Sequence, residues 1–232
     1  MKDVDTYVQE IEQDVKQYKA QANQEEIGWV TQVKDGVITL RGLDSVSYGE
    51  LIQFETGVEA MVIELMEAEV GAIVLGDYLK LRAGDVARAT GRTLSIPVSD
   101  EILGRVVDPL NHVLDGGAAI KSEVYQPVEK VAPGIVYRKS VTVPLQTGIK
   151  AIDALIPIGR GQRELIIGDR GTGKTTIAID AILNQREENV ICIYCAIGQK
   201  NSKIASIVDL LKSHKALDYT VVVSASASDP AA

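Results

Sequence analysis

The stretch Glu164–Leu183, ELIIGDRGTGKTTIAIDAIL, reads as a short apolar run, a glycine-rich turn and a helix. Within it, Gly168, Gly173, Lys174 and Thr175 match the spacing G-x-x-x-x-G-K-[ST] in full. Glycines let the backbone fold tightly, so that several N–H groups point to one place at the positive end of the following helix. The pattern predicts a phosphate-binding loop with a strand before it and a helix after it.

The residues of this loop have separate tasks in the predicted site. Lys174 brings a mobile positive charge to the terminal phosphates, and the Thr175 hydroxyl is placed to ligate Mg²⁺. The alternative is a glycine turn without a ligand, which the complete match between a strand and a helix disfavours. We therefore expect ATP or ADP with Mg²⁺ at Thr175, and nucleotide binding by Gly168, Asp169, Arg170, Gly171, Thr172, Gly173, Lys174 and Thr175.

Helix and strand patterns alternate around the loop from Ile149 onward. The sequence predicts short or full helices over 149–159, 173–187 and 201–217, and strands over 163–168, 189–198 and 219–225. In the helix over 201–217, one side carries Ile204, Ile207, Leu210 and Leu211. Such alternation implies right-handed crossovers and a mainly parallel sheet covered by helices.

Cys192 and Cys195 form a C-x-x-C pair that could indicate a zinc or redox site. The surrounding run is apolar and β-branched, which favours a buried strand. Residues three apart on a strand point to opposite faces, so the two thiols would diverge. We interpret them as strand residues.

The region from Ile27 to about Arg92 has a different pattern, with short apolar runs separated by Gly, Asp and Ser. Asp35-Gly36 is a hairpin signal. Several short strands at close spacing predict a small antiparallel β-barrel. Nothing here suggests catalysis, and we interpret its acidic residues as solvated strand faces: Glu50, Glu59 and Glu64.

The N-terminal segment predicts an amphipathic helix, because apolar residues recur at helical spacing at Val4, Tyr7, Ile11, Val15 and Tyr18. Periodicity leaves open whether this helix packs on its own domain or docks a partner. The expected domains are a helix over 1–26, a barrel over 27–93 and a nucleotide-binding domain over 94–232.

Composition excludes some classes. Of 232 residues 46% are hydrophobic, and 24 Lys and Arg face 32 Asp and Glu, which gives a net charge of −8. An acidic chain is a poor general nucleic-acid binder. No apolar run approaches the ~20 residues of a membrane helix, and the N-terminus has no apolar signal core or transit pattern. We expect a cytosolic chain whose membrane link runs through partners.

The segments 143–175 and 183–200, with 27–54 and 97–116, resemble the alpha subunits of the rotary (F-type) ATP synthase over what would be their N-terminal half. The resemblance implies an N-terminal helix and small antiparallel β-barrel, followed by part of an α/β P-loop (RecA-like) nucleotide-binding domain. It also implies a ring with alternating beta subunits around a gamma stalk, and a delta or peripheral-stalk contact through the N-terminal helix. The implied complex makes ATP using a proton or sodium gradient. Its place is the cytoplasmic side of a bacterial inner membrane or the plastid thylakoid equivalent, as a peripheral subunit.

Two positions bear on the chemistry. The family usually has Gln where this chain has Gly171, so a polar contact to the phosphates would be missing. Catalytic relatives carry a water-polarising Glu at the position of Gln199, near the gamma-phosphate. A neutral amide cannot accept a proton, so the resemblance implies a structural or regulatory site with no catalytic residue. The alternatives are a stand-alone nucleotide-binding scaffold and a catalytic hexameric P-loop ATPase.

The resemblance also implies that family members continue about as long again, with a metal-orienting strand, an arginine finger and a helical domain. Asp229 lies too far beyond the strand at 219–225 to supply the carboxylate of such a strand. We therefore expect a fragment or truncated product that binds nucleotide weakly. The isolated chain is expected not to hydrolyse ATP, although the parent complex is an enzyme.

Overall fold

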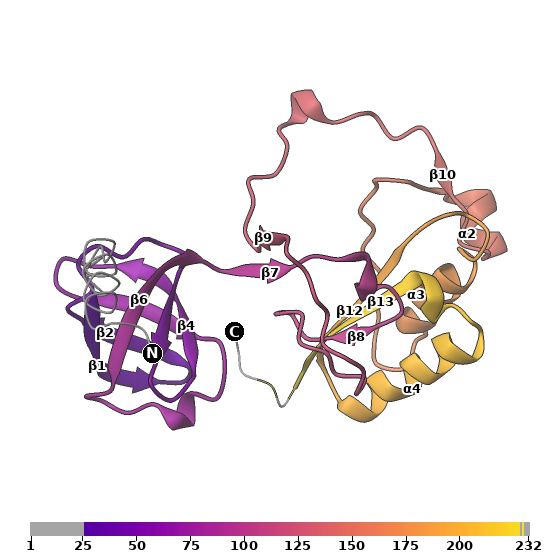
Figure 1. The fold of residues 1–232 in the computed structure, drawn as a ribbon. Helices are drawn as coiled ribbons and strands as arrows, with labels where there is room; N and C mark the ends of the chain where they lie inside the picture. Colours follow the sequence, from indigo (N-terminus) through magenta and orange to yellow (C-terminus); the bar gives the residue numbers. More distant parts are fainter. Residues whose placement is uncertain (1–25, 228, 230–232) are drawn as a thin grey trace, which may run out of the picture. The chain divides into compact units, whose positions relative to one another are not determined.

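A computed structural model describes residues 26–227 and Asp229, and the chain divides into two compact units between Gly91 and Arg92 (Figure 1). The predicted N-terminal helix lies outside the described residues. No helix in the described ranges is long and apolar enough to span a bilayer. The expected domain limits stay predictions, and each unit is treated by itself below.

The first unit is a closed antiparallel barrel with the strand order β1-β2-β5-β4-β3-β6. Its elements are β1 (Ile27–Lys34), β2 (Val37–Arg41), β3 (Glu50–Phe54), β4 (Glu59–Leu65), β5 (Val70–Val74), the short 3₁₀ helix η1 (Tyr78–Lys80) and β6 (Val86–Thr93). The ring closes where Ile27 of β1 pairs with Arg88 of β6. The predicted small antiparallel barrel is therefore confirmed.

Local sequence explains the first hairpin of the barrel. Asp35 and Gly36 both have positive φ, 49° and 83°, which are the conformations a tight hairpin turn requires and which Asp and Gly tolerate best. The turn sets the register in which Lys34 faces Val37. Alternating side chains then point inward to an apolar core that includes Val30, Ile38, Leu40, Ile52 and Val62.

Glu50 corrects one expectation. The side chain is only 8% exposed, whereas a solvated strand face was predicted. Its carboxylate accepts hydrogen bonds from the backbone N–H of Ser47 at 3.0 Å and of Gly91 at 2.9 Å. Burial is compatible with the charge because two backbone donors satisfy it. Glu59 is half-buried and Glu64 is exposed.

The second unit contains a parallel sheet with the order β12-β13-β8. Its strands and helices are β7 (Ser95–Pro97), η2 (Asp100–Ile102), β8 (Val106–Val107), β9 (Tyr125–Pro127), η3 (Ile135–Tyr137), β10 (Pro144–Leu145), α2 (Lys150–Leu155), β11 (Ile158–Gly159), α3 (Lys174–Leu183), β12 (Cys192–Gln199), α4 (Asn201–Ser213), η4 (Leu217–Tyr219) and β13 (Thr220–Ser226). The predicted parallel sheet with helices is confirmed. The helices predicted over 149–159, 173–187 and 201–217 are also confirmed, as α2, α3 and α4.

One apolar cluster joins α3 and α4 to the sheet. Ile179 of α3 and Ile204, Ile207 and Leu211 of α4 pack with strand residues that include Tyr194 of β12. Leu210, predicted on the same side of α4, is 40% exposed. The cluster anchors both helices to the same sheet, which matters because both begin near the predicted phosphate-binding loop.

The two cysteines lie on opposite faces of β12, as predicted. Cys192 is buried and Cys195 is exposed, so the face of β12 that carries Cys195 is open to solvent along with Ile193 and Ile197. Burial raises the pKa of the Cys192 thiol.

The predicted strand over 163–168 is wrong. These residues pair with no strand of the described chain, and Leu165 and Ile167 are 83% and 85% exposed. The apolar pattern is that of a strand, but a strand needs a partner for its backbone groups, and none of the described strands provides one.

Candidate nucleotide-binding site

The predicted phosphate-binding loop leads directly into α3, which begins at Lys174. Gly171 and Gly173 have positive φ, 83° and 90°. A Cβ at either position would meet no atom within 4 Å, so the backbone conformation, not crowding, favours glycine there. At Gly168, a Cβ would come 2.9 Å from the Thr172 hydroxyl, which itself donates to the Asp169 carbonyl at 2.8 Å.

The start of α3 is suited to an anion. No side chain caps its first turn, and that turn holds no acidic residue. The first N–H groups of a helix have no partner within the helix, and the helix dipole places partial positive charge there. A phosphate group satisfies both needs at once.

Lys174 folds back over the loop. Its ammonium donates to the carbonyl oxygens of Gly168 and Asp169, so the charge is held beside the turn and not extended into solvent. Phosphate oxygens are stronger acceptors than these carbonyls because they are charged. The lysine is therefore placed where a phosphate would engage it.

A second lysine, Lys203, reaches the same place from α4. Its Nζ lies 3.5 Å from Oγ1 of Thr175, the second residue of α3. Sequence reasoning missed this residue. A signal was available, because Lys203 stands in the first turn of α4, where the helix dipole favours an acidic residue.

Gln199 is the last residue of β12 and is half-buried. Its Nε2 donates to the Tyr194 hydroxyl at 3.3 Å, and its Oε1 is buried without a partner in the described ranges. The group at this position is neutral and carries one unused acceptor. Asp169 contributes its backbone carbonyl to Lys174, while Arg170 is exposed.

The donor set fits Mg²⁺ only as an ion that arrives with phosphate. In the described part of the chain no three His, Cys, Asp or Glu side chains gather at a point. At the start of α3 the Thr175 hydroxyl offers an oxygen ligand. Mg²⁺ characteristically binds substrate phosphates and water with few protein ligands, so the residues present fit this mode.

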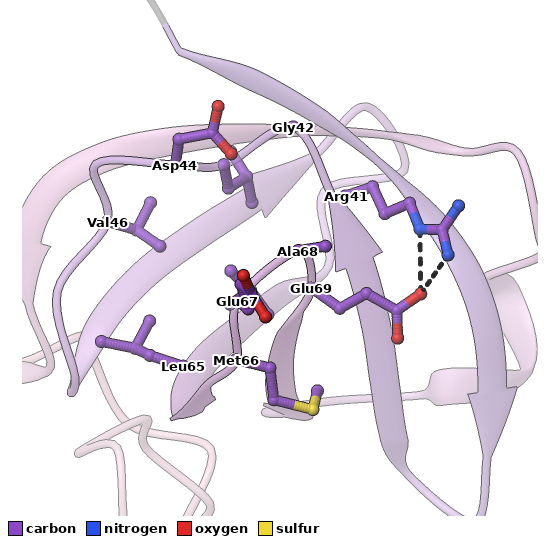
Figure 2. A pocket seen from close by; sticks show the side chains of 11 residues that line it. Arg41, Gly42, Asp44, Val46, Leu65, Met66, Glu67, Ala68 and Glu69 are labelled. Carbon is purple, nitrogen blue, oxygen red and sulfur yellow. Dashed lines mark hydrogen bonds and ion pairs between the residues drawn. The ribbon is translucent and has the colours of Figure 1, made fainter.

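A separate pocket lies in the barrel unit (Figure 2). It is a cavity of about 360 Å³ whose rim includes Arg41, Asp44, Leu65, Met66 and Glu67. Arg41 is engaged by Glu69, with Nε and Nη2 each 2.9 Å from one carboxylate oxygen. Its lining residues belong to the barrel, so this pocket is no part of the phosphate-binding loop.

Comparison with known proteins matches each unit. Residues 23–91 match the beta-barrel domain of the ATP synthase alpha/beta family, and residues 148–232 match the nucleotide-binding domain of the same family. Two proteins called "ATP synthase subunit alpha" are similar to this chain. They come from Limosilactobacillus reuteri (strain DSM 20016) and L. reuteri subsp. reuteri (strain JCM 1112). Each is 54% identical over 221 residues, which is 95% of this chain.

The same alignment covers 43% of each relative, so the chain spans less than half of their length. The barrel, the parallel sheet with its P-loop and both family matches agree with one another. The chain belongs to the ATP synthase alpha/beta family.

Proposed function

We propose that the chain binds Mg-ATP at a P-loop site of the alpha-subunit type, which holds nucleotide without cleaving it. The carrying observation is the uncapped first turn of α3 behind Gly171 and Gly173, with the Lys174 ammonium folded over the loop. This arrangement offers backbone donors and one mobile positive charge to a chain of phosphates.

Binding would proceed by exchange of hydrogen-bond partners. Lys174 leaves the carbonyls of Gly168 and Asp169 and donates to the terminal phosphates, while the N–H groups of the first turn of α3 take the remaining oxygens. The Thr175 hydroxyl would hold Mg²⁺, which would offset part of the negative charge of the phosphates.

Gln199 supports a holding role over a cleaving one. An amide can hydrogen-bond a water but cannot take its proton at neutral pH. A catalytic hexameric ATPase would need a carboxylate near this strand end. The neutral residue therefore favours a regulatory or structural nucleotide site, and with it the proposal that the isolated chain does not hydrolyse ATP.

The family match and the names of the two relatives support a wider proposal. The chain would take an alpha position, alternating with beta subunits around a gamma stalk. Its residues 1–26 would meet the delta or peripheral stalk. The complex would make ATP from ADP and phosphate with a transmembrane ion gradient, and this chain would be peripheral to the membrane.

The test of nucleotide binding is calorimetry with Mg-ATP on the 232-residue chain. Lys174→Ala should raise the Kd at least tenfold, because a charge-assisted contact is worth about 1.5–3 kcal/mol. Lys212→Ala, at the far end of α4, is the matched control and should leave the Kd unchanged. Equal affinity of the wild type and Lys174→Ala would remove the loop as the site.

The test of the holding role is steady-state phosphate release by the wild type and by Gln199→Glu. Neither should exceed the rate of Lys174→Ala, which measures contaminating ATPase. Release by the wild type that disappears in Lys174→Ala would reassign the chain to the catalytic ATPases.

A further inference from the structure

Two helix starts meet at the phosphate-binding loop. Lys203, the third residue of α4, places its Nζ 3.5 Å from Oγ1 of Thr175, the second residue of α3. The backbone beside Lys203 is fixed, because its neighbour Ile204 is only 5% exposed and packs in the cluster that contains Ile179 of α3. The approach of the lysine to the hydroxyl thus rests on the core and not on a free surface loop.

The two helix starts carry positive side chains that no acidic residue of their first turns balances. Neither α3 nor α4 has an acidic residue in its first turn, and neither has a side-chain cap. Lys174 and Lys203 both stand at the positive ends of helix dipoles, where a cation is unfavourable by a few tenths to about 1 kcal/mol. The ion pairs of the described residues include none between a carboxylate and Lys174, Lys203 or Lys200.

Like charges gathered at two helix starts are stable when a strongly charged anion neutralises them. The lysine side chain fits this task, since its ammonium is a compact charge with three donors on a flexible stem. An ammonium has three donors, so the Lys203 group that lies 3.5 Å from the Thr175 hydroxyl keeps further donors for a phosphate oxygen. That position is also beside the hydroxyl at which the proposed site would ligate Mg²⁺.

We propose that Lys203 is a second phosphate-binding cation, which supplies next to Thr175 part of the charge that Mg²⁺ otherwise brings. The site therefore binds ATP with a reduced requirement for the metal. With Mg²⁺ bound, the Thr175 hydroxyl would be one of its ligands, and the flexible stem of Lys203 would let its ammonium withdraw. This inference rests on the proposed nucleotide site and adds to it a residue and a metal dependence.

The test compares ATP binding by calorimetry in EDTA and in excess Mg²⁺, with the 232-residue chain and its Lys203→Met variant. Methionine keeps an unbranched apolar stem and removes the charge. In EDTA the variant should bind ATP at least about tenfold more weakly than the wild type. In Mg²⁺ the dissociation constants of the two proteins should differ less than about threefold. The ratio of the dissociation constant in EDTA to that in Mg²⁺ should therefore be larger for Lys203→Met than for the wild type.

Two further variants make the result specific. Lys212→Met removes a charge from the last turn of the same helix and should change neither constant. Lys203→Arg keeps the charge and should retain most of the affinity for ATP in EDTA. A fold defect at this position would instead weaken ATP binding in EDTA and in Mg²⁺ alike. Equal loss in EDTA and in Mg²⁺, or equal loss with Lys212→Met, would overturn the inference.

The inference and the site on which it rests fail differently. If Lys174→Ala weakens binding but Lys203→Met leaves metal-free binding unchanged, the nucleotide site stands and Lys203 is a solvated surface residue. If ATP does not bind the wild type in either buffer, the nucleotide site and the role of Lys203 both fall.

Discussion

The barrel and the nucleotide-binding unit differ in how far the apolar residues of their strands are exposed to solvent. In the barrel, β1 pairs with β6 and every strand has two neighbours, so the inward side chains of Ile38, Leu40 and Ile52 are at most 1% exposed. In the second unit, β12 is the first strand of an open sheet, and Ile193 and Ile197 on one of its faces are 64% and 78% exposed.

The difference teaches what an apolar pattern encodes. Residues 163–168 have the same pattern as the barrel strands, yet they form no ladder in the described chain. A pattern gives a segment the capacity to be a strand, and a neighbouring backbone makes it one. Closure supplies that neighbour for each barrel strand from within the first unit.

The largest effect expected from this comparison is a difference in the free energy of unfolding between Ile52→Ala and Ile167→Ala. Ile52→Ala in the barrel core should lower the free energy of unfolding by about 3 kcal/mol, whereas Ile167→Ala, at an 85% exposed residue, should change it by less than about 0.5 kcal/mol. Trp29 is the only tryptophan and belongs to β1, so its fluorescence in a urea titration follows the barrel. Far-UV circular dichroism serves for Ile167→Ala. Similar costs at both sites would mean that residues 163–168 are packed in solution.

A smaller effect concerns the carboxylate buried in the barrel. Glu50→Ala removes the acceptor of the Ser47 and Gly91 N–H groups and should cost about 2 kcal/mol. Glu64→Ala, on the exposed end of β4, is the matched control and should cost less than about 0.5 kcal/mol. The readout is again the urea midpoint by Trp29 fluorescence. If the two variants are equally stable, Glu50 is solvated as the pattern suggested.

The smallest effect belongs to an ion pair of the second unit. Arg105 donates to Asp115 through Nε at 2.7 Å and Nη2 at 2.8 Å, and this pairing holds the pKa of the Asp115 carboxyl well below its ordinary 3.8. Because the folded-state pKa is depressed, the stabilisation is complete well above pH 3.8 and is lost as the pH falls below it. Asp115→Asn should cost about 1 kcal/mol at pH 7.

The check is thermal unfolding of the wild type and Asp115→Asn between pH 7 and pH 2, followed at 222 nm. Among the described residues, the α-helices α2, α3 and α4 all belong to this unit, so the signal at 222 nm is sensitive to its unfolding. The gap between the two proteins should narrow as the pH falls from about 4 to 2. A gap that stays constant to pH 2 would contradict a depressed pKa at Asp115.

Sequence reasoning predicted the parts of the fold that are encoded by near neighbours. Asp35-Gly36 predicts the first hairpin because Asp and Gly tolerate the positive φ angles that its turn has in the structure. The spacing of Ile204, Ile207 and Leu211 predicts the buried side of α4. Residues on one turn or one helix face interact across three or four positions, so the sequence carries the information locally.

The features that sequence reasoning did not predict depend on residues far apart in the chain. Glu50 is buried because Gly91, forty-one positions later, brings it a backbone donor. Lys203 lies beside Thr175, twenty-eight positions earlier, because α3 and α4 pack into one apolar cluster with the sheet. No periodicity within a strand or a helix records such pairings. The loop residues from Gly168 to Thr175 were found because the motif and its chemistry are contiguous, and their role in binding stays a prediction.

The closure of the barrel also has a consequence for how the chain is made. Ile27 pairs with Arg88, so the ring cannot close until about sixty residues after β1 have been synthesised and have left the ribosome. Once Thr93 has emerged, all six strands are available, while the loop that begins at Gly168 has not yet been translated. The barrel can therefore be complete on the ribosome before β12 and β13 of the second unit are translated, and early folding of the N-terminal unit keeps its strands from pairing with those later strands.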